Sequence, residues 1–187
     1  HFFTVECNVE PILHSDEKPE FDEYRWATPR TLLDEWMANE IRLPPPLVMI
    51  LRELLEDTIE KSIARMSSTP PRKNTRIEFG PGVECLPLPT DTLPPSTHTN
   101  CYVLGLPGGD RVIIDPAAKC VDGLTQLQEK VDSILKEGST IVGTIFTHRH
   151  QDHIGDLEAI SQLYTAPIWG SRETLDSIII EAETRLL

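Results

Sequence analysis

The sequence predicts an α/β protein whose strands alternate with amphipathic helices. Three observations lead to this fold class. Apolar runs of strand length recur in the second half of the chain, and stretches with apolar residues at helical spacing lie between them. Hydrophobic residues make up 39% and charged residues 25% of the chain, as in globular rather than disordered proteins. A group of histidines directly follows one apolar run, which predicts a site at the mouth of a buried strand.

The second half of the chain accounts for most of the expected sheet. Strands are expected at residues 83–88, 98–105, 111–115, 140–146 and 166–169. The turn-forming sequence Pro107-Gly108-Gly109-Asp110 joins the second and third of them as a hairpin. Helices are expected at residues 121–137, at residues 154–164 and from residue 171 onward, and the first of them is clearly amphipathic.

The first part of the chain reads mainly as helical. Residues 1–10 alternate weakly, as in a strand, and residues 14–23 form a polar loop. A helix opens with Thr28 as its N-cap and Pro29 in its first turn. The longest helix is expected at residues 47–66, with an apolar stripe that packs in a core. Residues 67–76 have the serine, threonine, proline and basic composition of a linker.

The histidine-rich segment His148-Arg149-His150-Gln151-Asp152-His153 has the composition of a metal site. His148 and His150 are two positions apart, so their side chains point the same way in an extended chain. The chain then turns, and Asp152 and His153 come back toward the same space. Imidazole and carboxylate groups are ligands of zinc and similar divalent ions. The chain has 6 histidines in total, so their concentration here favours a metal site over surface-loop histidines.

Composition excludes several other classes of function. The net charge of −13, without a basic stripe, disfavours extended nucleic-acid binding, because an acidic surface repels polyanions. No apolar run is long enough for a membrane span. The 4 cysteines match neither a zinc ribbon nor a disulfide framework in their spacing. We expect them to be reduced and buried, which predicts an intracellular protein.

Three blocks of sequence follow one another in a familiar order. Thr99-Asn100-Cys101-Tyr102-Val103-Leu104-Gly105 has the form T-N-x-Y-L-V-G, and Val112-Ile113-Ile114-Asp115-Pro116 is a strand that ends in an aspartate. The histidine segment, with Thr147 before it and Ile154-Gly155 after it, is close to T-H-x-H-x-D-H-x-G-G. These blocks resemble the metallo-β-lactamase superfamily of metallo-hydrolases over about residues 77–187, in particular its glyoxalase II-like and β-lactamase-like endoribonuclease branches. Asp156 replaces the second glycine.

The resemblance implies an αββα sandwich, of which this chain would supply the N-terminal half. His148 and His150 would bind a first metal ion, and Asp152 and His153 a second. One or two zinc ions are expected, with iron or manganese as alternatives. Asp115 would anchor the histidine loop. The family's further ligands lie downstream, and no histidine follows His153 here, so four of the expected ligands are present.

The first part of the chain has a resemblance of its own. Glu23-Tyr24-Arg25-Trp26-Ala27-Thr28-Pro29 and Ile41-Arg42-Leu43-Pro44-Pro45-Pro46 are similar to the C-terminal part of Nudix-type domains. Arg52-Glu53-Leu54-Leu55-Glu56-Asp57 imitates the acidic cluster of the Nudix box, but Pro44 and Ala38 stand where the box needs other residues. We interpret these acids as a solvated helix face and the segment as a non-catalytic remnant.

The sequence therefore predicts a Nudix-like α+β segment at residues 1–66, a linker at 67–76 and the N-terminal half of a metallo-β-lactamase domain at 77–187. The expected function is zinc-dependent hydrolysis, in which a metal-activated hydroxide attacks a thioester, an acyl ester or a phosphodiester. Asp152 would orient that hydroxide if one metal ion binds. His98 is a surface residue or a substrate contact.

Two alternatives stay open at this point. The first is a non-catalytic binding or scaffold module that retains part of the metal site. The second concerns assembly: a half-domain leaves one sheet face and one strand edge without partners, so self-association, or a partner that supplies the missing half, is expected.

Overall fold

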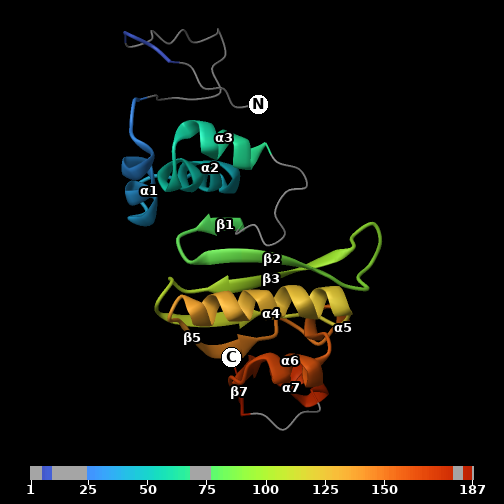
Figure 1. Cartoon of the computed structure of the whole chain (residues 1–187). Coiled ribbons are helices and arrows are strands. Elements are labelled where there is room, and N and C mark those ends of the chain that lie inside the picture. Colours follow the sequence, from blue (N-terminus) through green and yellow to red (C-terminus); the bar gives the residue numbers. More distant parts are fainter. Residues whose placement is uncertain (1–5, 10–24, 68–76, 179–182, 187) are drawn as a thin grey trace, which may run out of the picture.

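The structure, a computed structural model, describes residues 6–9, 25–67, 77–178 and 183–186 (Figure 1). The order of its elements is α1 (Pro29–Met37), α2 (Pro45–Glu56), α3 (Ile59–Met66), β1 (Ile77–Gly80), β2 (Val83–Pro89), β3 (His98–Leu104), β4 (Asp110–Ile114), α4 (Val121–Lys136), β5 (Thr140–Ile145), α5 (Gln151–Ile154), α6 (Leu157–Leu163), β6 (Ile168–Gly170), α7 (Arg172–Ser177) and β7 (Thr184–Leu186). The fold class is α/β, as predicted. None of the described helices is long and apolar enough to cross a membrane.

All described strands belong to one 7-stranded sheet, in which the spatial order is the order of the chain. Strands β1 to β4 are antiparallel neighbours, whereas β4, β5, β6 and β7 run parallel. Because β4 and β5 are parallel, the segments that follow them leave the sheet at the same edge. The loop between β2 and β3 lies at this edge too, because β3 runs antiparallel to β4.

One face of the sheet forms the main core against α4, which lies in front of the strands in Figure 1, and against α6. Its buried residues are Leu86, Leu88, Cys101, Val103, Ile113, Ala118, Leu127, Val131, Ile134, Ile141 and Ile160. Side chains alternate along a strand, so Tyr102, Ile114 and Trp169 lie on the opposite face. They are half-buried, and the main core includes none of them.

The prediction of one long helix at residues 47–66 is wrong, because two side chains divide it. Asp57 accepts a hydrogen bond from the backbone N–H of Thr58 at 2.9 Å, and Thr58 is the N-cap of α3. These local bonds end α2 and begin a second helix with its own direction. The predicted stripe is therefore not a continuous core. Leu51 is buried, but Ile59 is 51% exposed and Met66 is 42% exposed.

The predicted helix at residues 154–164 corresponds to α6, which begins later, at Leu157, because Ile154 belongs to the separate short helix α5. Gly155 has a φ of +72°, and a Cβ there would lie 2.5 Å from the carbonyl carbon of Ala117. Only glycine fits this close approach. Asp156 then caps α6 by accepting from the backbone N–H of Ala159 at 3.0 Å. The aspartate in place of a second glycine thus begins the next helix.

Two of the four cysteines are buried, and the other two are exposed. Cys85 and Cys101 are buried, as expected, and burial raises the pKa of both thiols. Cys7 and Cys120 are exposed, so the expectation that they are buried is wrong. Cys120 lies outside the core because it precedes α4 as its N-cap, where its Sγ accepts from the backbone N–H of Gly123 at 3.4 Å.

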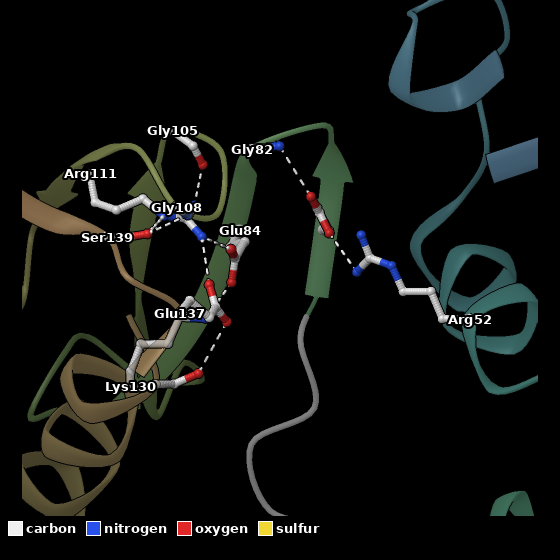
Figure 2. A network of polar contacts seen from close by, with 11 residues as sticks. Arg52, Gly82, Glu84, Gly105, Gly108, Arg111, Lys130, Glu137 and Ser139 are labelled. Atoms are coloured by element: carbon white, nitrogen blue, oxygen red, sulfur yellow. Dashed lines mark hydrogen bonds and ion pairs between the residues drawn. The ribbon is translucent and has the colours of Figure 1, made fainter. Parts of the chain in front are cut away.

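The N-terminal helices pack against the sheet at β1, as Figure 1 shows. Arg52 on α2 pairs with Glu78 on β1 at 2.7 Å, and its guanidinium lies 5.5 Å from the ring centroid of Trp36 on α1. Glu78 also accepts from the backbone N–H of Gly82 at 3.1 Å (Figure 2). Arg52 therefore links α1, α2 and β1. The predicted strand at residues 1–10 lies largely outside the described residues, as do the loop at 14–23 and most of the linker at 67–76.

A buried charge network lies at one end of the strands, opposite to the end that carries the histidine loop (Figure 2). The Arg111 side chain is fully buried on β4. It pairs with Glu84 on β2 at 3.2 Å and with Glu137, after α4, at 3.1 Å. It also donates to the carbonyl of Gly105, and Lys130 on α4 pairs with Glu84. One guanidinium thus joins β2, β4, the β3–β4 turn and the end of α4.

Replacing Arg111 by methionine keeps much of the side-chain volume but removes the central cation from two carboxylates. We expect a loss of about 3–5 kcal/mol in the free energy of unfolding, because breaking a buried ion pair leaves a charge poorly compensated. Urea unfolding followed by circular dichroism measures this. The matched control is Arg30→Met at an exposed position of α1, which should unfold at the wild-type urea concentration. Equal midpoints for the two variants would contradict the role given to Arg111.

Candidate metal centre

The histidine loop begins where β5 leaves the core. Phe146 is fully buried, and the chain then turns outward through Thr147, His148 and Arg149. His150 is the N-cap residue of the short helix α5, and its carbonyl accepts from the backbone N–H of His153 at 3.0 Å. This turn brings both ends of the predicted motif to one place. Arg149 points away to pair with Glu173 in the first turn of α7.

The structure brings the predicted ligands together. The ring centroids of His148 and His150 are 4.6 Å apart, and those of His148 and His153 are 4.1 Å apart. Nε2 of His148 lies 3.1 Å from Nδ1 of His150. Nε2 of His153 lies 4.0 Å from the Asp152 carboxylate. The four side chains thus form a compact group of nitrogen and oxygen donors at the edge of the sheet.

Asp115 joins this group from the end of β4. Its Oδ1 accepts from the backbone N–H of Thr147 at 2.8 Å, and its Oδ2 accepts from the Thr147 hydroxyl at 2.6 Å. The same Oδ2 lies 2.9 Å from Nδ1 of His153. The carboxylate is buried, and its residue has a φ of +47°, a conformation that aspartate tolerates better than most residues. Asp115 therefore holds both the start of the histidine loop and its last histidine.

Thr147 connects Asp115 to His148 through its hydroxyl group. Its Oγ1 lies 3.0 Å from Nδ1 of His148. Because the hydroxyl proton is directed to the Asp115 carboxylate, Oγ1 accepts a hydrogen bond from His148, whose proton is therefore on Nδ1. His153 carries its proton on Nδ1 for the same reason, since a carboxylate only accepts. Both rings therefore leave Nε2 unprotonated, as a metal-binding nitrogen must be, although Nε2 of His148 contacts Nδ1 of His150.

Asp152 is half-buried on α5. A hydrogen bond from the Thr92 hydroxyl is the main cause that holds the pKa of its carboxyl below the ordinary value, and its own backbone N–H, His153 and His150 act in the same direction. Burial opposes them. His98, at the start of β3, is exposed, and its Nδ1 lies 2.8 Å from the hydroxyl of Thr97.

The donor set has the right chemistry for a divalent ion, but its members do not surround one point. Within the described parts of the chain, no three or more His, Cys, Asp or Glu side chains are arranged to hold a metal ion. The facing nitrogens of His148 and His150 explain this, since they contact each other. Imidazole and carboxylate suit zinc, iron and manganese, so the residue types do not discriminate among these metals.

Sequence reasoning gave no role to two polar residues of this site, Thr147 and Thr92. Thr147 directly precedes His148 at the end of a buried strand, and that adjacency is the signal that could have identified it. Thr92 had no such signal, because it lies 60 positions before Asp152 in a proline-rich loop. Only the topology of the sheet brings that loop to the histidines.

Comparison with known proteins agrees with the motif. Residues 94–183 match the family model described as the metallo-beta-lactamase superfamily. A beta-lactamase domain protein from Burkholderia ambifaria is 24% identical, with a TM-score of 0.46 over 60% of this chain and 35% of that one. The BLEG-1 B3 metallo-beta-lactamase is 26% identical, with a TM-score of 0.32 over 46% of this chain and 35% of that one. The chain thus spans about a third of the length of these two proteins. No curated protein matches it.

Replacing Thr147 by valine should change the protonation of the His148 ring. Valine has nearly the same shape but cannot accept the proton on Nδ1, so we expect the neutral ring to shift toward the tautomer protonated on Nε2. Long-range proton–nitrogen NMR on the metal-free protein in mildly alkaline buffer reports the tautomer directly. His98 is the internal control and should not change. An unchanged His148 tautomer would show that Thr147 does not orient this ring.

Proposed function

We propose that the protein is a metal-dependent hydrolase whose ion binds at His148, His150, Asp152 and His153, because residues 94–183 match the family model described as the metallo-beta-lactamase superfamily. Members of this superfamily typically bind metal ions. The observation that carries the proposal is the hydrogen-bonded chain from Asp115 to His153 and, through Thr147, to His148. Metal-binding histidines typically donate the N–H of one ring nitrogen to an oxygen acceptor such as a carboxylate, which leaves the other ring nitrogen for the metal.

The residues of the site would have separate roles in metal binding and in the activation of water. A bound zinc ion lowers the pKa of its water to about 7 and polarises a carbonyl or phosphoryl oxygen. His148 and His153 would each present Nε2, because Nδ1 is already engaged. His150 would have to turn its ring away from His148 to present a nitrogen to the same ion. Asp152 is ionised at neutral pH, since its pKa is lowered, so it can hold the attacking water by accepting a proton from it.

We propose a thioester, another acyl ester or a phosphodiester as the substrate class. Each of these presents an oxygen that gains negative charge during attack, which a divalent cation stabilises. The net charge of −13 opposes long polyanions, so a small molecule or a short phosphodiester fits better than a nucleic-acid duplex.

A second candidate function is a binding or scaffold module that retains only part of the site. The contact between His148 and His150 favours it, because these rings face each other at 3.1 Å rather than a common point. Metal content separates the two functions. About one to two zinc ions per chain in the full-length protein favours the enzyme, whereas a protein without tightly bound metal favours the scaffold.

We also propose that the N-terminal helical segment has no hydrolytic chemistry of its own and is a Nudix-like remnant. Two acids of its box-like cluster are already engaged. Glu53 and Asp57 both pair with Arg65 on α3, at 2.8 and 3.3 Å. A carboxylate that faces a guanidinium is a poor ligand for magnesium, which supports a packing role for this segment.

The first test of the proposed function is metal stoichiometry. In the full-length protein, the double substitution of His148 and His150 by alanine should remove most of the bound metal, because it deletes two of the four proposed ligands. Elemental analysis of the purified protein gives the ratio of metal to chain. His98→Ala, an exposed histidine of the same edge, is the matched control. Equal metal content in wild type and double variant would refute the assignment of these ligands.

The second test is turnover. We expect the full-length protein to hydrolyse a chromogenic thioester or phosphodiester, to lose this activity with a chelator and to regain it with zinc. Asp152→Asn should lower kcat by at least about 100-fold, because the loss of a general base typically has effects of 10²–10⁴-fold. Activity that survives both the chelator and the substitution would exclude this mechanism.

A further inference from the structure

Helix α7 begins at the sheet edge that carries the histidine loop. It follows β6, which pairs in parallel with β5, so both strands end at this edge. The backbone N–H of Phe146, at the end of β5, donates to the carbonyl of Trp169 on β6 at 2.9 Å. The histidine loop and the start of α7 therefore leave neighbouring strands side by side.

Side chains of α7 and of both ends of the histidine loop share one small core. Phe146 precedes the loop and Ile154 ends α5, and Leu175 of α7 packs against the cluster that contains both. Thr174 is also buried, and Ser171 caps the helix by accepting from the backbone N–H of Thr174 at 3.3 Å. This close packing fixes the backbone of α7 relative to both ends of the loop.

An ion pair connects α7 to the middle of the loop. Nη1 of Arg149 donates to Oε1 of Glu173, which lies in the first turn of α7. Arg149 stands between His148 and His150, and side chains alternate along an extended chain, so its guanidinium leaves the loop on the side away from both rings. The pair therefore ties the backbone between two proposed ligands to a helix whose position is fixed.

His150 is the proposed ligand that depends most on this backbone. A hydroxyl contacts the His148 ring at 3.0 Å, and a carboxylate contacts the His153 ring at 2.9 Å. The His150 ring is exposed and contacts His148 at 3.1 Å, and among the described residues no side chain from another element bonds to it. The ring must leave that contact to reach a shared ion. The place of its backbone, directly after Arg149, decides where the ring can turn.

We propose that Arg149 and Glu173 are positioning residues, whose ion pair holds the middle of the histidine loop in the place from which the His150 ring can reach the metal ion. The proposal rests on the proposed function. The two paired side chains are 55% and 69% exposed, so water and salt weaken their attraction. The effect on metal affinity is therefore expected to be about three- to fivefold, the upper range for an exposed ion pair, and to depend on salt.

The experiment measures the zinc affinity of the full-length protein by competition with a chromophoric chelator. The double variant Arg149→Gln/Glu173→Gln breaks the pair without a change of net charge, so direct effects of the two charges on the ion largely cancel. Arg172→Gln/Asp176→Asn, an equivalent change at two exposed residues of α7, is the matched control. Each protein is measured at about 0.01 M and about 1 M of a salt with a weakly coordinating anion, since salt screens exposed charges. Circular dichroism confirms that each variant is folded.

At low salt, we expect the double variant to bind zinc about three- to fivefold more weakly than wild type, and the control to stay within about 1.5-fold of wild type. At high salt, the difference between the double variant and wild type should vanish. A double variant that binds zinc as tightly as wild type at low salt refutes the positioning role while the proposed function stands. A loss that persists unchanged at high salt, or that the control shows equally, also refutes it, because the ion pair is then not the cause. If wild type itself binds no zinc, the proposed function fails and this inference with it.

Discussion

The buried carboxylate of Asp115 is the interaction on which the site depends. It ends β4, and three hydrogen bonds connect it to the segment that follows β5. A buried carboxylate is costly unless its oxygens accept hydrogen bonds, so the same bonds that satisfy Asp115 also fix the histidine loop. One residue therefore couples the stability of the sheet edge to the orientation of His148 and His153.

The two ends of the central strands have different chemistry. At the edge away from the histidines, Arg111 and Lys130 neutralise Glu84, and the cations and carboxylates face each other in a closed network (Figure 2). At the other edge, Nε2 of His153 lies 4.0 Å from the Asp152 carboxylate, beyond hydrogen-bond distance. The first arrangement stabilises the fold. The second leaves groups that can bind an ion, which agrees with the superfamily match at residues 94–183.

The N-terminal helices are connected to the sheet more closely than a linker at residues 67–76 suggests. Arg52 contacts both Trp36 and Glu78, so the helical segment covers strand β1, which is otherwise an edge of the sheet. Covering an edge strand prevents its pairing with another chain. Tyr102, Ile114 and Trp169 lie on the opposite face of the sheet and are not part of the main core. The expectation that this face self-associates or binds a partner stays a prediction.

The sequence alone predicted the fold class, most strand positions and the cluster of histidine and aspartate side chains at residues 148–153, because these depend on periodicity and on residue types at short spacing. That this cluster binds a metal ion stays a prediction. It also identified Asp115, through resemblance rather than through geometry. It failed where a single side chain caps the start of a helix, as at Thr58 and Asp156, since capping bonds interrupt a pattern that apolar spacing would continue. Tertiary structure alone decided that Thr92 meets Asp152 and that Arg111 meets Glu137. Those pairs are distant in sequence, and only the pairing and direction of the strands bring them into contact.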